Sequence, residues 1–255
     1  MTIAVGMVCT DGLLICADTR QTVEGECVWE DTKMLKGASS QFGDYVAAGC
    51  GQTSFIYMAF ERIEKALSDP RNAKLDFSEI LQREIAKIHK HIKTCSDPRQ
   101  PLPWVELIVG CHKQPEKPLL VHVDSSGGIS PVADKIFMGT GRPIAVAFAR
   151  IILKERLPLK LARIAAFFFM YQAKESGYGT GGETQACYLP REKGMGGWDD
   201  KLIAEQVERM MRLSLLDARN CDLSPEKFNE RLKEVIQTMT EVRISACRPK
   251  PSFEG

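Results

Sequence analysis

The sequence of 255 residues predicts a layered α+β domain in which the sheets are mainly antiparallel. Short apolar segments typical of strands cluster at the start and in the middle of the chain, whereas segments with helical periodicity come in consecutive pairs. Helix layers packed on antiparallel sheets fit this order better than a parallel sheet, in which strands and helices would alternate. Asp11-Gly12, a strong hairpin signal between the first two apolar segments, indicates that the chain begins inside an antiparallel sheet.

The first part of the chain supplies strands and then a helix. Strands are expected over residues 2–9 and 13–19, then over 28–35 and 45–48, after which Gly49 and Gly51 interrupt the pattern. A helix is expected over 52–68, because apolar residues recur there at helical spacing. These residues are Phe55, Ile56, Ala59, Phe60, Ile63, Ala66 and Leu67. The dipeptide Asp69-Pro70 should end this helix.

The middle of the chain repeats the scheme. Apolar residues at helical spacing predict a helix over 77–94 that lies beside the first. Strands over 104–111 and 118–124 should form a hairpin, and the segment 135–138 leads into the turn Gly139-Thr140-Gly141. Helices follow over 143–155 and 158–175, and a strand over 184–189. Phe167, Phe168 and Phe169 should pack in a core or between subunits.

The last part of the chain is expected to be mostly helical. Helices are predicted over 200–216 and 225–239, with Ser224 before Pro225 as the start signal of the second, and a short strand over 241–246. No internal repeat or low-complexity linker separates this part from the rest. Residues 1–255 are therefore interpreted as one domain, with 197–255 as its helical C-terminal extension.

Composition narrows the functional classes. The 34 Lys and Arg residues against 33 Asp and Glu give a net charge of +1, which offers no long-range attraction to nucleic acid or to an anionic membrane. The nine cysteines are scattered without a CxxC pair, so neither a disulfide framework nor a zinc site is expected, and a reducing cytoplasm suits them. No secretory signal precedes the first strand, and the most apolar helix contains Lys160 and Arg163, so neither export nor membrane insertion is expected.

Several motifs together resemble a proteasome β subunit. They stand in the order of that family: Thr2-Ile3-Ala4-Val5-Gly6, Asp11-Gly12, Ala17-Asp18-Thr19-Arg20, Lys33 and Ala48-Gly49. Gly139-Thr140-Gly141 and Thr180-Gly181-Gly182 are similar to two further turns of the family. The resemblance reaches about residue 190 and extends to bacterial proteasome-like proteins that start at a Met-Thr dipeptide.

The resemblance implies a fold and a function. The fold is the N-terminal nucleophile (Ntn) hydrolase sandwich, with four layers in the order αββα and two antiparallel sheets between the helix layers. The function is that of a threonine-type endopeptidase acting on peptides or unfolded proteins, without a cofactor or metal. The family assembles into rings, so a homo-oligomeric ring is expected, with an ATP-dependent unfoldase as a possible partner.

The implied chemistry agrees with elementary reactivity. A threonine hydroxyl needs a base, and once Met1 is removed the α-amino group of Thr2 can serve as that base. Lys33 would lower the pKa of this amine, and Asp18 would hold Lys33 by a charge-assisted hydrogen bond. By the resemblance, the backbone N–H of Gly49 would stabilise the oxyanion, and Thr140 and Thr180 would position the amine. The family usually has an aspartate where this chain has Gly177, which weakens the expected support of the amine.

Each member of this set also has a purely structural interpretation. Asp18 with Lys33 could be a salt bridge, Gly49 could mark the start of a helix, and the two threonines could cap turns. No metal site is expected, because His89 and His91 lie on different helix faces and His112 and His122 lie on separate strands without a neighbouring carboxylate-cysteine pattern. Two alternative functions remain: a catalytically silent ring subunit, and an Ntn amidase that acts on a small molecule.

Overall fold

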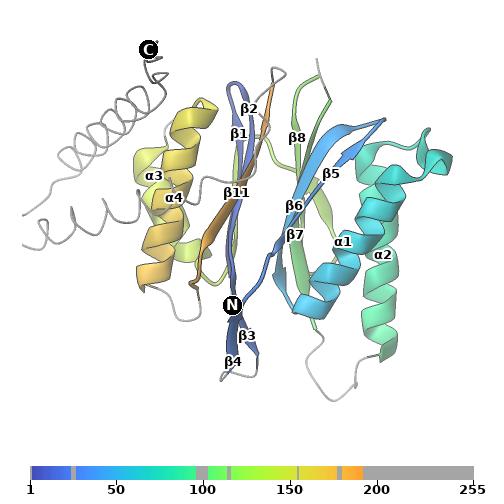
Figure 1. Cartoon of the computed structure of the whole chain (residues 1–255), viewed down its shortest axis with the longest axis horizontal. Helices are drawn as coiled ribbons and strands as arrows, with labels where there is room; N and C mark the ends of the chain where they lie inside the picture. Colours follow the sequence, from blue (N-terminus) through green and yellow to red (C-terminus); the bar gives the residue numbers. More distant parts are fainter. Residues whose placement is uncertain are drawn as a thin grey trace, which may run out of the picture.

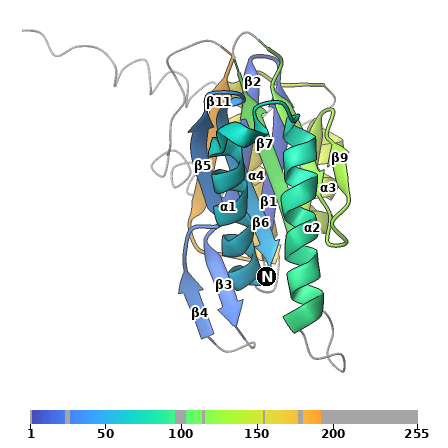
Figure 2. The ribbon, with the colours of Figure 1, turned by 90° about the vertical axis from the view of Figure 1, so that its right-hand side faces the viewer.

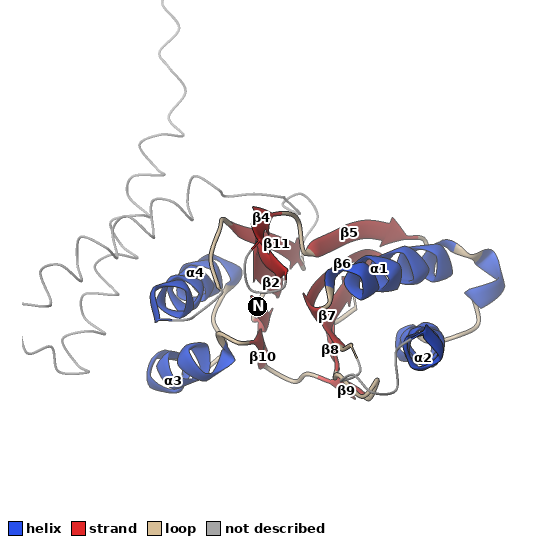
Figure 3. Cartoon of the chain, turned by 90° about the horizontal axis from the view of Figure 1, so that it is seen from below, coloured by secondary structure: helices blue, strands red, loops and turns tan. Residues whose placement is uncertain are grey.

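The computed structural model describes residues 2–23, 27–95, 103–113, 116–153, 155–176 and 180–191. These residues form four layers, in which two antiparallel sheets lie face to face and a pair of helices covers the outer face of each sheet (Figures 1 and 3). The predicted αββα sandwich is therefore confirmed. The helices predicted over 200–216 and 225–239, the strand over 241–246 and the extension 197–255 lie outside the described residues.

The first sheet contains four strands in the order β10-β1-β2-β11, and every neighbouring pair is antiparallel. Its strands are β1 (Ile3–Cys9), β2 (Gly12–Asp18), β10 (Lys135–Gly139) and β11 (Thr184–Pro190). Strands β1 and β2 form the predicted hairpin, in which Cys9 pairs with Gly12. The hairpin thereby brings Asp18, the last residue of β2, back to the end of the sheet where the chain begins.

The second sheet contains five strands in the order β5-β6-β7-β8-β9. Its strands are β5 (Met34–Ser39), β6 (Gly43–Gly51), β7 (Val105–His112), β8 (Leu119–Val123) and β9 (Ile129–Pro131). Strands β7 and β8 form the predicted hairpin.

The single strand predicted over 28–35 is wrong. Strand β4 (Cys27–Glu30) pairs with β3 (Arg20–Val23) in a separate two-stranded hairpin. The strand conformation is then interrupted until β5 begins at Met34 (Figure 2). The break occurs because β4 and β5 pair with different partners. Lys33 is one of the non-strand residues between them, so the direction of its side chain is not set by the alternating pattern of a strand.

Four α-helices flank the sheets close to the predicted positions: α1 (Thr53–Ser68), α2 (Phe77–Cys95), α3 (Arg142–Ile152) and α4 (Leu159–Ser176). Helix α1 ends before Asp69-Pro70 as predicted, and a short 3-10 helix (Pro70–Asn72) leads to α2. Helix α3 is shorter than the predicted 143–155. None of the helices in the described part of the chain combines the length and apolar character that a membrane span requires.

Three apolar cores hold the layers together, one in each space between neighbouring layers. Alternate residues of β1 illustrate why: Ile3 and Val5 belong to the core under α3 and α4, whereas Ala4 between them belongs to the core between the sheets. The predicted packing of Phe167, Phe168 and Phe169 in a core is confirmed, since each is at most 1% exposed. Both sheets are thus covered on both faces, which explains their nearly continuous apolar strands.

Candidate active site

Three of the residues singled out in the sequence meet at the beginning of β1. Thr2 precedes this strand and is 4% exposed, and the Nζ atom of Lys33 lies 2.7 Å from its Oγ1 atom. The same Nζ atom lies 3.0 Å from Oδ1 of Asp18. A hydroxyl, an ammonium and a carboxylate therefore form one buried hydrogen-bonded line, although they come from three different segments of the chain.

Asp18 is fully buried and surrounded by donors. Besides Lys33, the backbone N–H of Ile3 donates to its Oδ1 at 3.2 Å and the N–H of Gly181 donates to its Oδ2 at 3.0 Å. Burial raises the pKa of the Asp18 carboxyl, and the Lys33 charge together with these two N–H groups opposes that rise. The donors hold the carboxylate in one orientation, aimed at Lys33.

Lys33 is 3% exposed, and its ammonium also donates to the carbonyl oxygen of Arg20. Burial lowers the pKa of Lys33, while the Asp18 carboxylate opposes this shift. An ammonium that donates to the Thr2 hydroxyl stabilises the negative charge that develops on Oγ1 when this hydroxyl loses its proton.

The turn from β10 to α3 fixes the backbone of Thr2. Gly139 has φ +82°, and a Cβ atom there would lie 2.1 Å from the Thr2 carbonyl oxygen, so only glycine fits. The same oxygen lies 3.4 Å from both the hydroxyl of Thr140 and the backbone N–H of Gly141. Thr140 thus contacts the backbone of Thr2 rather than its side chain.

Thr180 lies one residue from an Asp18 donor, but its hydroxyl points elsewhere. It donates to the Ala173 carbonyl oxygen at 2.8 Å, near the end of α4, and the Thr180 carbonyl accepts from Arg20 at 3.2 Å. The side chain therefore secures the turn that carries Gly181 to Asp18. Gly177, which stands in place of the family aspartate, lies outside the described residues.

The backbone N–H of Gly49 is already engaged. It donates to the Lys33 carbonyl oxygen at 3.0 Å and so continues the pairing of β5 with β6. A Cβ atom at this position would lie 2.6 Å from the side chain of Ile56, which gives a packing reason for the glycine. Gly49 adjoins the site through Lys33, but stabilising an oxyanion would require this N–H to be shared or released.

Sequence reasoning missed a polar chain beside Gly49. The thiol of Cys50 lies 3.7 Å from Oε2 of Glu106, its partner across the strands, and Oε1 of Glu106 lies 2.7 Å from Nε2 of His122. These contacts could not be predicted, because they depend on the register of β6 with β7. Burial, and then the charge of Glu106, raises the pKa of Cys50 far above its ordinary value, so this thiol stays protonated and is a poor nucleophile.

Three further cysteines and His112 are buried. Cys9, Cys16 and Cys111 are free and buried, as predicted for apolar surroundings. His112 does not face solvent, because its two ring nitrogens each lie 2.9 Å from a carbonyl oxygen, of Pro190 and of Glu116. In the described part of the chain, no three His, Cys, Asp or Glu residues form a group that could hold a metal ion.

Comparison with known proteins identifies the family and the fold. The model of the family described as "Proteasome subunit" matches residues 2–189. No curated protein matches the sequence. Among solved structures, the fold is similar to the helical assembly of the Anbu complex from Pseudomonas aeruginosa, with a TM-score of 0.72 and 14% identity over 88% of this chain and 98% of that chain.

Two further structures have the same fold. Anbu (ancestral β-subunit) from Yersinia bercovieri gives a TM-score of 0.72 at 14% identity, covering 87% of this chain and 98% of that one. Anbu from Hyphomicrobium sp. strain MC1 gives 0.70 at 13% identity with the same coverage. At such identities, the likeness establishes the fold and leaves the activity to be argued from the site.

Proposed function

This chain belongs to the proteasome subunit family, and we propose that it is a threonine-type endopeptidase whose nucleophile is Thr2 after removal of Met1. The observation that carries the proposal is the 2.7 Å contact between Lys33 Nζ and Thr2 Oγ1, with Asp18 fixed behind Lys33 at 3.0 Å. A buried ammonium beside a hydroxyl that precedes the first strand is the arrangement that an N-terminal nucleophile requires.

The reaction follows from these contacts. The α-amino group of Thr2, exposed when Met1 leaves, accepts the hydroxyl proton while Oγ1 attacks the carbonyl carbon of the peptide bond. Lys33 keeps the amine neutral by disfavouring a second positive charge nearby. The proton passes to the departing amine, which leaves an ester on Thr2, and water then hydrolyses the ester and restores the hydroxyl.

The remaining site residues have supporting roles in this proposal. Thr140 and the turn around it position the Thr2 backbone, and Thr180 holds the turn that presents Gly181 to Asp18. The Gly49 N–H would stabilise the oxyanion by sharing the hydrogen bond that it now gives to Lys33. No cofactor or metal takes part in these steps.

We also propose that the chain works in the cytoplasm as a self-assembled particle that admits peptides or unfolded proteins, with an ATP-dependent unfoldase as a possible partner. Family membership supports self-assembly, and one structure of similar fold is described as a helical assembly. The scattered, buried free cysteines suit a reducing compartment.

A second candidate function is a catalytically silent subunit of such a particle. It is favoured by two hydrogen bonds that a purely structural subunit would also make: Gly49 N–H to the Lys33 carbonyl, and the Thr180 hydroxyl to the Ala173 carbonyl. An Ntn amidase acting on a small molecule is the remaining alternative, and substrate preference separates it from a peptidase.

The test is hydrolysis of a panel of fluorogenic peptides and small amides by protein that has lost Met1. Thr2→Ala should remove peptide hydrolysis, because no other residue supplies the hydroxyl, while Thr2→Ser should keep part of it. Full activity of Thr2→Ala would overturn the mechanism. Cleavage of small amides alone would favour the amidase, and no cleavage by processed wild-type protein would favour the silent subunit.

A further inference from the structure

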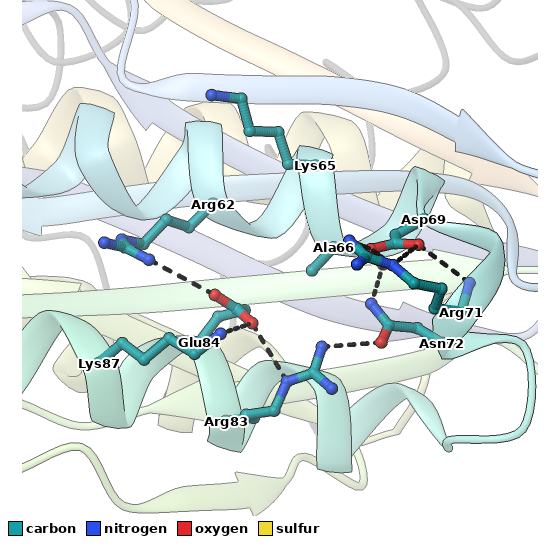
Figure 4. A pocket seen from close by; sticks show the side chains of 9 residues that line it. All are labelled: Arg62, Lys65, Ala66, Asp69, Arg71, Asn72, Arg83, Glu84 and Lys87. Carbon is teal, nitrogen blue, oxygen red and sulfur yellow. Dashed lines mark hydrogen bonds and ion pairs between the residues drawn. The ribbon is translucent and has the colours of Figure 1, made fainter.

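A cavity of about 500 Å³ lies between α1 and α2, in the helix layer that covers the second sheet (Figure 4). Five cationic side chains line it: Arg62, Lys65, Arg71, Arg83 and Lys87. The turn between the two helices, which supplies Asp69, Arg71 and Asn72 to the lining, lies at the opposite end of this layer from the N-terminus (Figure 1). The cavity is thus separate from the Thr2 site, and nothing in the proposed peptidase reaction uses it.

The cavity carries an excess of positive charge. Its lining contains only two carboxylates, Asp69 and Glu84, against the five cations, which leaves three positive charges. Asp69 is bound by Arg71 at 2.7 Å. Lys65 pairs at 2.5 Å with Glu61 outside the lining, and even when Glu61 is counted, two positive charges remain. The cavity therefore has more cations than are needed to neutralise these carboxylates.

Glu84 organises three of the cations. Its side chain is 7% exposed and lies 2.7 Å from Lys87 Nζ, 3.2 Å from Arg83 Nε and 3.7 Å from Arg62 Nη1. One buried carboxylate thus gathers three positive groups from two helices at one side of the cavity, as Figure 4 shows. Lys87 and Arg83 are thus already hydrogen-bonded beside the cavity, which reduces the side-chain entropy that binding a ligand would cost.

Two of the guanidinium groups keep donors for a ligand. Arg83 uses Nε for Glu84 and one N–H of Nη2 for Asn72 at 2.9 Å, while Asn72 is itself held by the Ala66 carbonyl at 2.8 Å. Arg62 makes only its 3.7 Å ion pair among the described residues. Because guanidinium carries five N–H groups, each arginine retains donors that can bind the oxygens of an anion.

The lining also defines the class of ligand. Ala66 is the only apolar residue among those around the cavity, whereas pockets for ordinary small molecules are mostly apolar. The volume exceeds that of a single phosphate and lies within the range of small-molecule sites. Guanidinium and ammonium groups converging on such a space favour a compact anion with several oxygens, which phosphate groups supply.

We propose that the cavity between α1 and α2 binds a small phosphate-bearing anion of the pyrophosphate class, held by Arg62, Arg83 and Lys87. The site extends the molecule beyond the proposed peptidase function. It would bind its ligand equally in a Thr2→Ala protein, so the failure of either proposal leaves the other intact.

Isothermal titration calorimetry of the full chain with inorganic pyrophosphate tests the site. We expect saturable binding, weakened about ten-fold or more in Arg62→Gln, because that variant removes one of the three cations proposed to hold the anion and leaves Glu84 paired with Arg83 and Lys87. The matched control Lys90→Gln removes the same charge from an exposed position on α2 and should bind as the wild type does. No saturable binding, or equal weakening in both variants, would overturn the proposal.

A second variant works in the opposite direction. Glu84→Gln removes the negative charge from the lining, while its side-chain carbonyl oxygen can still accept hydrogen bonds from Lys87 and Arg83, so pyrophosphate should bind several-fold more tightly, with retained folding checked by thermal unfolding. If this variant does not fold, the first pair of variants decides the matter. Inorganic phosphate should compete with pyrophosphate. Competition by a short peptide with a free C-terminal carboxylate, but not by phosphate, would assign the cavity to a polypeptide end and contradict the proposal.

Discussion

At the scale of single residues, the central feature is the line from Thr2 through Lys33 to Asp18. Lys33 lies outside any strand, between β4 and β5, and this break lets its side chain reach inward to both partners. Burying the charged Asp18 and Lys33 costs free energy, because burial raises the pKa of Asp18 and lowers that of Lys33. Such a pair is a poor source of stability, which favours a role in chemistry over the structural interpretation.

The Lys33→Met variant separates the two interpretations. We expect peptide hydrolysis to fall by about a hundred-fold or more, because the amine of Thr2 loses the charge that keeps it neutral. The free energy of unfolding should fall by about 3–5 kcal/mol, since Asp18 becomes an unpaired buried charge. Activity is measured with the fluorogenic peptides, and stability by denaturant unfolding.

The double variant Asp18→Asn/Lys33→Met is the matched control. Removing both charges should recover much of the lost stability, because no unpaired buried charge remains, while hydrolysis stays low. Recovery of activity together with stability would mean that the pair serves the fold alone.

The sequence anticipated this residue-level site unevenly. Thr2, Asp18 and Lys33 were found because their spacing matches a known pattern, and the structure brings them together. The sequence did not predict that the Gly49 N–H donates to the Lys33 carbonyl or that the Thr180 hydroxyl donates to the Ala173 carbonyl. Such hydrogen-bond partners depend on strand register and turn geometry. Glu106 was missed for the same reason: it meets Cys50 and His122 only through strand pairing.

At the scale of elements, apolar periodicity predicted most strands and all four described helices. The failures have physical causes. Strand β3 (Arg20–Val23) carries no apolar run, and β9 (Ile129–Pro131) is short and follows a turn-rich segment. The segment over 28–35 looked continuous because both of its halves favour strands, yet the halves pair with different partners. Pairing is decided by tertiary structure, which local sequence does not record.

Glu84 on α2 binds Lys87 and Arg83 of the same helix and Arg62 of α1, and its contribution to stability should depend on pH. Burial raises the pKa of Glu84, but hydrogen bonds from Lys87 and Arg83 outweigh it, so the pKa in the folded chain lies below its ordinary value. A carboxyl with a lowered pKa stabilises the fold above its unfolded pKa of about 4.3, and this contribution is lost as the pH falls through the folded value. We expect the free energy of unfolding of the wild type to exceed that of Glu84→Gln by about 1–3 kcal/mol at pH 7.

Urea unfolding of both proteins between pH 7 and pH 3 measures this difference. It should be constant above about pH 5 and shrink below about pH 4. Glu64→Gln, on the exposed face of α1, is the control and should show little difference from wild type at any pH. A difference for Glu84→Gln that does not change with pH would show that the charge of Glu84 does not stabilise the fold.

At the scale of the whole molecule, the four layers place the Thr2 site at one end of the sandwich and the cationic cavity at the other end of one helix layer (Figure 1). The layer order was predictable once the motifs suggested the family, because the fold accompanies them. The size of any assembly was not predictable, since contacts between copies depend on surface shape rather than on apolar periodicity.

Self-assembly is expected in solution. Light scattering coupled to size-exclusion chromatography should give a particle whose mass is a multiple of the chain mass and persists on dilution. Because proteasome-type particles enclose their sites, small peptides should be cleaved and folded proteins spared. A monomer at all concentrations would contradict the proposed particle. The chemistry of Thr2 would then be tested separately, by the labelling experiment below.

The most direct measurement is intact-protein mass spectrometry of cytosolically expressed protein, with and without a β-lactone or epoxyketone that reacts with an N-terminal threonine. We expect loss of Met1 and a single covalent adduct on the wild type, absent from Thr2→Ala. Retained Met1, or a processed chain that forms no adduct, would contradict the claim that Thr2 is an active nucleophile.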